Sequence, residues 1–145
     1  MKKLIFSIAV LFVLCTAFYP LKDPSKDIIG KWRFDESSII TATKSLIKTA
    51  RKADPIKANQ MDQNFDQISE MIRSMVFNYE KDHNYELTTS QGNQIGKWSL
   101  AENDQILVLN RPGRPDRRDR ILLLSFVKLQ LVNGETQDTI LFVRP

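Results

Sequence analysis

The chain changes hydrophobic period twice along its length. Over residues 28–34 apolar residues alternate with polar ones, so that Ile28, Trp32 and Phe34 share one face. This period of two predicts a half-buried β-strand. From residue 37 the apolar residues recur at steps of three and four, and the period returns to two at residue 76. The pattern therefore predicts a helical insertion over about residues 37–75, placed between a first strand and a longer β region.

The insertion carries the signals of two helices. Asp54 and Pro55 form a cap and a first-turn proline, which predicts that one helix ends and another begins there. The first helix is the weaker prediction, because several β-branched residues near residue 40 slightly disfavour a helix. The second helix shows one apolar stripe. That stripe consists of Met61, Phe65, Ile68, Ile72 and Met75.

Seven more strands are predicted after the insertion. The alternating segments cover residues 76–81, 85–89, 95–100, 105–110, 121–127, 129–132 and 139–144, and a polar loop covers residues 111–120. Short connections favour antiparallel pairing of sequence neighbours. We therefore expect a mainly β fold, an antiparallel up-and-down barrel of about eight strands with two helices between the first and second strands. An open sheet covered by the helices is the alternative.

Two segments and one arginine resemble features of a known family. Gly30-Lys31-Trp32 resembles the Gly-x-Trp signature of lipocalins, and residues 85–109 are similar to the mid-domain pattern of bacterial lipocalin-like domains, members of the calycin group. Ordinary lipocalins lack the long insertion, but some bacterial lipocalin-like domains carry one. The resemblance implies that Gly30, Trp32 and Arg144 form a structural signature, with the guanidinium over the indole at the closed end of a barrel.

Aromatic residues at inward strand positions are candidates for lining a ligand cup. Such residues give an apolar wall with a few polar tips, and flexible methionines suit an adaptable helical lid. A filled core is the alternative interpretation of the same pattern. The ligand-binding candidates are Tyr79, Tyr85, Leu87 and Trp98 on strands and Phe65 and Met75 on the second helix.

The predicted loop over residues 111–120 holds the densest charge cluster. Arg114, Arg117 and Arg118 are candidates for binding an anionic surface or an acidic partner, because guanidinium groups match carboxylates and phosphates with two bonds. The alternative is a solvated loop whose aspartates pair with its arginines.

Catalytic chemistry has few candidate residues. His83 is the one histidine and falls at a predicted hairpin tip, which argues against histidine-based metal sites and serine–histidine triads. No phosphate-binding glycine loop is visible. The basic residues are interleaved with aspartates and lack aromatic stacking partners, which argues against nucleic-acid binding. We therefore expect a protein that is not an enzyme and needs no metal or cofactor.

The amino terminus has the pattern of a secretory signal. Lys2 and Lys3 precede an apolar run that is too short to span a membrane, and cleavage after Ala17 fits the small residues there. The prediction is a signal peptide over residues 1–17, a tether over 18–27 and a lipocalin-like barrel domain over 28–145. A lipoprotein anchored through Cys15 is the minority alternative, because bulky Leu14 precedes the cysteine.

Removal of the signal lowers the formal net charge from +4 to +2, because Lys2 and Lys3 are its charged residues. The mature chain of about 125 residues fits one domain, and one cysteine in the whole sequence excludes an internal disulfide.

We expect an exported protein of the periplasm or cell envelope, or a secreted one, without a transmembrane segment. The predicted function is binding of a small apolar or amphipathic ligand in the barrel. The alternative is an envelope interaction or structural protein with a filled barrel.

Overall fold

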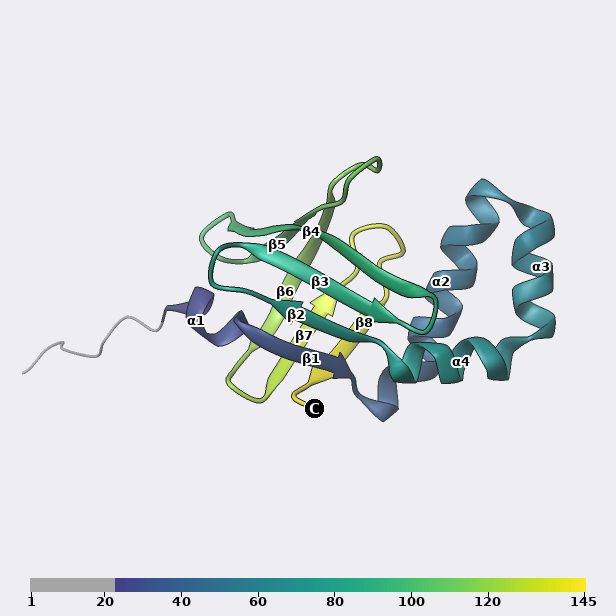
Figure 1. Ribbon diagram of the computed structural model, residues 1–145, viewed down its shortest axis with the longest axis horizontal. Coiled ribbons are helices and arrows are strands. Elements are labelled where there is room, and N and C mark those ends of the chain that lie inside the picture. Colours follow the sequence, from purple (N-terminus) through teal and green to yellow (C-terminus); the bar gives the residue numbers. More distant parts are fainter. Residues whose placement is uncertain (1–22) are drawn as a thin grey trace, which may run out of the picture.

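The computed structural model describes residues 23–145, which form a closed barrel with a helical insertion at one end (Figure 1). Each strand pairs antiparallel with its sequence neighbour, and β8 pairs with β1 to close the barrel. The predicted eight-stranded up-and-down barrel is confirmed. The predicted signal peptide over 1–17, including Cys15, and residues 18–22 of the predicted tether lie outside the described residues.

The strands follow the predicted alternation closely. They are β1 (Gly30–Phe34), β2 (Val76–Tyr79), β3 (Asn84–Thr89), β4 (Gly92–Ala101), β5 (Ile106–Asn110), β6 (Arg117–Leu124), β7 (Lys128–Val132) and β8 (Thr139–Val143). The inward residues of these strands form the core around Trp32, Leu107 and Leu129, each at most 1% exposed. A bulge between Ile121 and Leu123 shifts the register of β6 against β7.

The insertion lies between β1 and β2, as predicted, but it contains three α-helices rather than two. After a 3-10 turn η1 (Glu36–Ser38) come α2 (Ile39–Ala53), α3 (Pro55–Gln63) and α4 (Phe65–Ser74). The Asp54 carboxylate caps α3 by accepting from the Lys57 backbone N–H at 3.0 Å. The predicted second helix is divided at Asn64, where the backbone leaves helical geometry. The break allows α4 to turn back toward the barrel, whereas α3 packs along α2.

The second half of the predicted tether is helical, so the prediction of a tether was wrong there. Residues 24–28 form a short helix, α1 (Pro24–Ile28), which Asp23 caps by accepting from the Ser25 backbone N–H at 3.1 Å. Ile28 is fully buried. The proline and aspartates of this stretch suggested a flexible tether, but proline and aspartate are also common at the first turn and the cap of a helix. The folded unit therefore begins before residue 28.

The predicted loop over residues 111–120 is also corrected, because β6 begins at Arg117. Side chains alternate across a strand, so Arg117 and Asp119 face the barrel interior whereas Arg118 is exposed outside. The sequence pattern placed all ten residues in a solvent-exposed loop because seven of them are charged and the other three are proline and glycine. A buried arginine and a buried aspartate that neutralise each other give the same pattern.

The end of the barrel near α1 is closed by Trp32. Its indole is fully buried and donates from Nε1 to the carbonyl oxygen of Ile28 at 2.7 Å. The guanidinium carbon of Arg144 lies 3.9 Å from the centre of the Trp32 ring. Gly30 has a φ of +115°, and a Cβ there would lie 2.5 Å from Arg144 Nη1. Glycine is therefore required both by the backbone and by the close approach of the arginine.

In the described part of the chain, residues 23–145, no helix combines the length and apolarity needed to cross a bilayer.

Candidate functional site: a cavity at the helix-covered end of the barrel

A cavity of about 230 Å³ lies inside the barrel at the end covered by the helices. Its walls come from the inward residues of the strands and from one face each of α2 and α4, represented by Ala42 and Ile72. The loop over residues 111–116 and the β7–β8 turn, residues 133–138, lie at the same end of the barrel (Figure 1). The helical insertion therefore forms part of the cavity wall and is more than an appendage.

One side of the cavity is aromatic and aliphatic. Phe34, Phe77 and Phe142 pack against one another, with ring centres 5.7 Å apart between Phe34 and Phe77 and 5.5 Å apart between Phe77 and Phe142. All three line the cavity, together with Met75 of the α4–β2 junction and Leu87 of β3. These side chains offer a ligand dispersion contacts and no hydrogen bonds.

The polar side of the cavity includes an ion pair between Arg117 and Asp119 of β6. Arg117 donates from Nε and Nη2 to Asp119 Oδ2 at 2.8 and 2.6 Å. Asp119 is 1% exposed, and its Oδ1 accepts from the Gly134 backbone N–H at 3.0 Å. Burial acts to lower the pKa of Arg117, but attraction to Asp119 outweighs it and the pKa lies above its ordinary value. Arg117 therefore remains a cation inside the barrel.

Two more arginines from the β5–β6 connection reach the same cavity. Arg111 donates from Nη2 to Glu135 Oε1 at 2.6 Å and to the carbonyl oxygen of Pro115 at 2.8 Å. Arg114 also lines the cavity, is exposed, and makes no ion pair with any of residues 23–145. The cavity is thus amphipathic, with an apolar wall and a cationic side.

Tyr85 of β3 projects its ring toward this cationic side. The ring passes over Gly96 of β4, where a Cβ would lie 2.6 Å from Tyr85 Cε1. Burial raises the pKa of Tyr85, and the charges of Arg111, Arg117 and Arg114 partly oppose the rise. The phenol is therefore protonated at neutral pH and able to donate a hydrogen bond. Among the described residues its hydroxyl has no hydrogen-bond partner.

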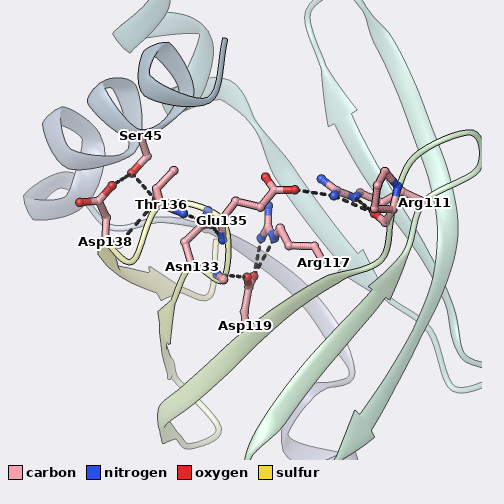
Figure 2. Close-up of polar contacts among 10 residues, drawn as sticks. Ser45, Arg111, Arg117, Asp119, Asn133, Glu135, Thr136 and Asp138 are labelled. Carbon is pink, nitrogen blue, oxygen red and sulfur yellow. Dashed lines mark hydrogen bonds and ion pairs between the residues drawn. The ribbon is translucent and has the colours of Figure 1, made fainter. Parts of the chain in front are cut away.

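A polar network joins this site to helix α2 (Figure 2). The Ser45 hydroxyl donates to Asp138 Oδ2 at 2.5 Å, and the Thr136 hydroxyl donates to Ser45 Oγ at 3.2 Å. Asn133 Oδ1 accepts from the Glu135 backbone N–H at 2.8 Å, which shapes the β7–β8 turn. The same turn supplies the partners of Arg117–Asp119 and of Arg111, so α2 and the arginines are held by one scaffold.

The structure brings together half of the predicted ligand-binding residues. Tyr85, Leu87 and Met75 line the cavity, whereas Tyr79, Trp98 and Phe65 do not. Tyr79 packs edge-on against Trp98 with ring centres 6.0 Å apart, below the cavity floor, and Trp98 Nε1 donates to the Glu80 carbonyl at 2.9 Å. Phe65 is half-buried at the start of α4. The filled-core interpretation therefore describes one layer of the barrel and the cup interpretation describes another.

The three predicted anion-binding arginines do not form one surface. Arg114 and Arg117 line the cavity, whereas Arg118 lies on the outer face and pairs with Glu102 at 2.8 Å. The predicted set fails as a group because it assumed a loop, and a strand sends neighbouring side chains to opposite faces.

Several cavity residues were missed by the sequence analysis. Arg111 was part of the noted charge cluster but was not selected as a candidate, and Glu135 was not considered as one. Asp119 was treated as a solvent partner. One signal was available: Arg117 and Asp119 are two apart, which is the spacing of residues on one face of a strand. Nothing local distinguishes an inward face from an outward one when both are charged.

The side chains at this site supply hydrogen-bond donors and an apolar wall. Its two carboxylates are already paired, Glu135 with Arg111 and Asp119 with Arg117. Within residues 23–145 there is no group of three or more histidine, cysteine, aspartate or glutamate side chains placed to hold a metal ion. Such a site is equipped to bind an amphipathic molecule and to orient it.

No protein-family model matches the chain, and a search of curated proteins gives no match. Among solved structures, the chain is similar to the crystal structure of a DUF4847 family protein from Bacteroides vulgatus ATCC 8482. The two share 13% sequence identity and a TM-score of 0.47, and the similarity covers 80% of this chain and 92% of that chain.

Proposed function

We propose that this protein is an exported, lipocalin-like binding protein that takes a small amphipathic molecule into its barrel and performs no catalysis. The observation that carries this proposal is the cavity of about 230 Å³ with an apolar wall and a cationic side. Binding sites for small molecules are typically concave and mostly apolar, with a few placed polar groups that fix orientation.

The closed end of the barrel supports the lipocalin-like part of the proposal. Trp32 sits on the barrel floor with Arg144 stacked above it, and Gly30 makes room for the arginine. This is the arrangement that the Gly-x-Trp resemblance implies. Export to the periplasm or cell envelope is supported by the charged and apolar pattern of residues 1–17.

Native mass spectrometry tests the proposed function. The protein is purified under nondenaturing conditions from the cell fraction in which it accumulates, and its native mass is compared with its denatured mass. We expect a surplus corresponding to a bound small molecule, which disappears on denaturation. The same measurement on Ala42→Phe should show no surplus, because Ala42 lines the cavity and a phenyl ring would occupy it.

Ala53→Phe is the matched control. It makes the same substitution on the same helix, but Ala53 is exposed at the end of α2 and lies away from the cavity. Retention of the surplus by Ala53→Phe and its loss in Ala42→Phe would locate the ligand. A native mass equal to the denatured mass, repeated after incubation with fatty acids and other amphiphiles, would refute the proposed function.

A second candidate function, an envelope interaction protein, is favoured by the tip of the β6–β7 hairpin. Phe126 is 73% exposed and Val127 is 54% exposed, and Leu122 and Leu123 near them are also exposed. Exposed apolar residues near one another are typical of contact surfaces. Pull-down from the cell envelope with wild type and with Phe126→Ser tests this candidate. It predicts a partner protein that the wild type retains and the variant does not.

A further inference from the structure

We infer that the ligand is a small monoanionic amphiphile whose carboxylate binds Arg114, Arg117 and Tyr85 while its apolar body lies against the phenylalanine wall. This inference rests on the proposed function and specifies its ligand class. It follows from the charges, the unused donors, and the volume of the cavity.

The charges lining the cavity leave one positive charge unmatched. Three arginines and two carboxylates face it. Arg117 is neutralised by Asp119 and Arg111 by Glu135. Arg114 is left without an ion-pair partner among residues 23–145. A ligand with one negative charge would be attracted to Arg114, whereas a cation would be repelled by it and a neutral molecule would gain no Coulomb attraction from it.

Donors without partners converge on the same side. Arg117 uses Nε and Nη2 on Asp119, and no hydrogen bond within the described residues involves its Nη1. The Tyr85 hydroxyl is likewise unpartnered, and it lies close enough to all three arginines for their charges to act on its pKa. Planar guanidinium groups bind a carboxylate through two parallel bonds, and a phenol adds a third donor. These donors are complementary to a carboxylate.

The position of Arg114 sets the direction of binding. Arg114 is exposed on the loop over residues 111–116, whereas Phe77 and Phe142 are buried at 6% and 5% exposure. A charged head held at Arg114 stays partly hydrated, and the apolar body enters the barrel first. This arrangement avoids complete desolvation of the ligand charge.

The volume limits the size of the ligand. A cavity of about 150 Å³ accommodates benzene, so 230 Å³ accommodates roughly nine or ten non-hydrogen atoms. A medium-chain acid such as octanoate has that size. A long-chain fatty acid would exceed the cavity unless α2 moved.

Calorimetric titration of the purified protein, after removal of bound small molecules, tests the inference with three probes of one chain length. These are octanoate, octan-1-ol and octylammonium. We expect octanoate to bind at least tenfold more tightly than octan-1-ol, and octylammonium to bind more weakly still. The preference for octanoate should decrease as salt is raised, because Arg114 is exposed and its attraction is screened.

Three variants identify the donors. Arg114→Gln should weaken octanoate binding about tenfold without affecting octan-1-ol, and its exposed position protects the fold. Tyr85→Phe should weaken octanoate several-fold and leave octan-1-ol unchanged, because only the hydroxyl is removed. Arg118→Gln is the matched control, since it removes the same charge from the outer face, and it should bind octanoate as wild type does.

The outcomes separate the two proposals. Equal binding of octanoate and octan-1-ol, or octanoate affinity unchanged in Arg114→Gln, overturns the anionic ligand and leaves a binding protein for apolar molecules. Equal losses in Arg114→Gln and Arg118→Gln overturn the cavity site, because they indicate general attraction to a positive protein. No binding of any probe, together with no mass surplus in the native protein, overturns both the ligand class and the proposed function.

Discussion

The two ends of the barrel each hold an arginine against the core, but the two arginines are satisfied in different ways. Arg144, at the α1 end, donates to three backbone carbonyls, those of Phe126 at 3.0 Å, Lys31 at 3.2 Å and Asp27 at 2.7 Å. Arg117, at the end covered by the helices, donates to one carboxylate and keeps one amino group without a described partner.

The difference shows how the same residue type serves structure at one end and lines a cavity, the proposed binding site, at the other. Carbonyls from three segments and the face of Trp32 occupy the Arg144 guanidinium, so it ties α1, β1 and the β6–β7 turn together. The Arg117 guanidinium is fixed by Asp119 but still faces a cavity. We therefore expect changes at the first end to reduce stability alone, and changes at the second end to affect both stability and binding.

The largest effect is expected from Trp32→Ala at the closed end. The substitution removes a fully buried indole and its hydrogen bond to Ile28, which should lower the free energy of unfolding by about 3–5 kcal/mol. Urea denaturation followed by circular dichroism measures this change. A stability equal to wild type would show that the closed end is not a structural anchor.

At the opposite end, Asp119→Asn should lower the free energy of unfolding by about 3 kcal/mol, because it leaves Arg117 charged and unpaired inside the barrel. Asp116→Asn is the control, since Asp116 is exposed and, within residues 23–145, hydrogen-bonds only to Asn110. It should change stability by less than about 0.5 kcal/mol. Urea denaturation of both variants makes the comparison. Similar small losses in both would mean that Arg117 reaches solvent.

Gly30→Ala should cost about 2 kcal/mol, because an alanine at a φ of +115° is strained and its Cβ meets Arg144. Gly92→Ala separates the two causes, since Gly92 has a φ of +125° but nothing lies within 4 Å of its Cβ position. A larger loss for Gly30→Ala in thermal denaturation measures the contact with Arg144. Equal losses would assign the whole effect to the backbone.

The smallest effect concerns the contact of helix α2 with the β7–β8 turn. The Ser45 hydroxyl holds the pKa of Asp138 below its ordinary value of 3.8 by a hydrogen bond. A carboxyl with a lowered folded-state pKa stabilises the protein above the unfolded value and loses that stabilisation as the pH falls through the folded value. Ser45→Ala should therefore raise the pKa of Asp138, which NMR titration measures, and reduce the stability lost below about pH 4. An unchanged pKa would show that Ser45 does not hold the turn.

The barrel was predictable because its information is local and repeated. Alternation along each strand and short turns between strands restrict the topology to few solutions, and antiparallel neighbours with no free edge form a barrel. Asp54 and Pro55 likewise marked the start of α3. The division at Asn64 was not predictable, because the stripe from Met61 to Met75 continues through it in the sequence. Packing of α4 on the barrel decided that break.

The candidate site was predictable only in part. Tyr85, Leu87 and Met75 were identified from their place in an alternating or helical pattern, and that pattern determines which side of an element a residue occupies. It does not determine depth along the barrel axis. Tyr79 and Trp98 share the inward side with Tyr85, but they pack into a filled layer below the cavity.

By itself the sequence predicted eight strands, their order and their antiparallel pairing, because these depend on periodicity and on loop length. Closure was the favoured of two alternatives, and the start of β6 was predicted too late in the chain. Only the tertiary structure decided that Arg117 lies inside the barrel and Arg118 outside. The two are neighbours of the same type, and the start of β6 sets their sides. Arg117 is stable inside the barrel because Asp119 neutralises it. The Gly134 backbone N–H, from a different segment, donates to the same carboxylate. The candidate site is built from contacts between segments distant in sequence, and such contacts exist only after folding.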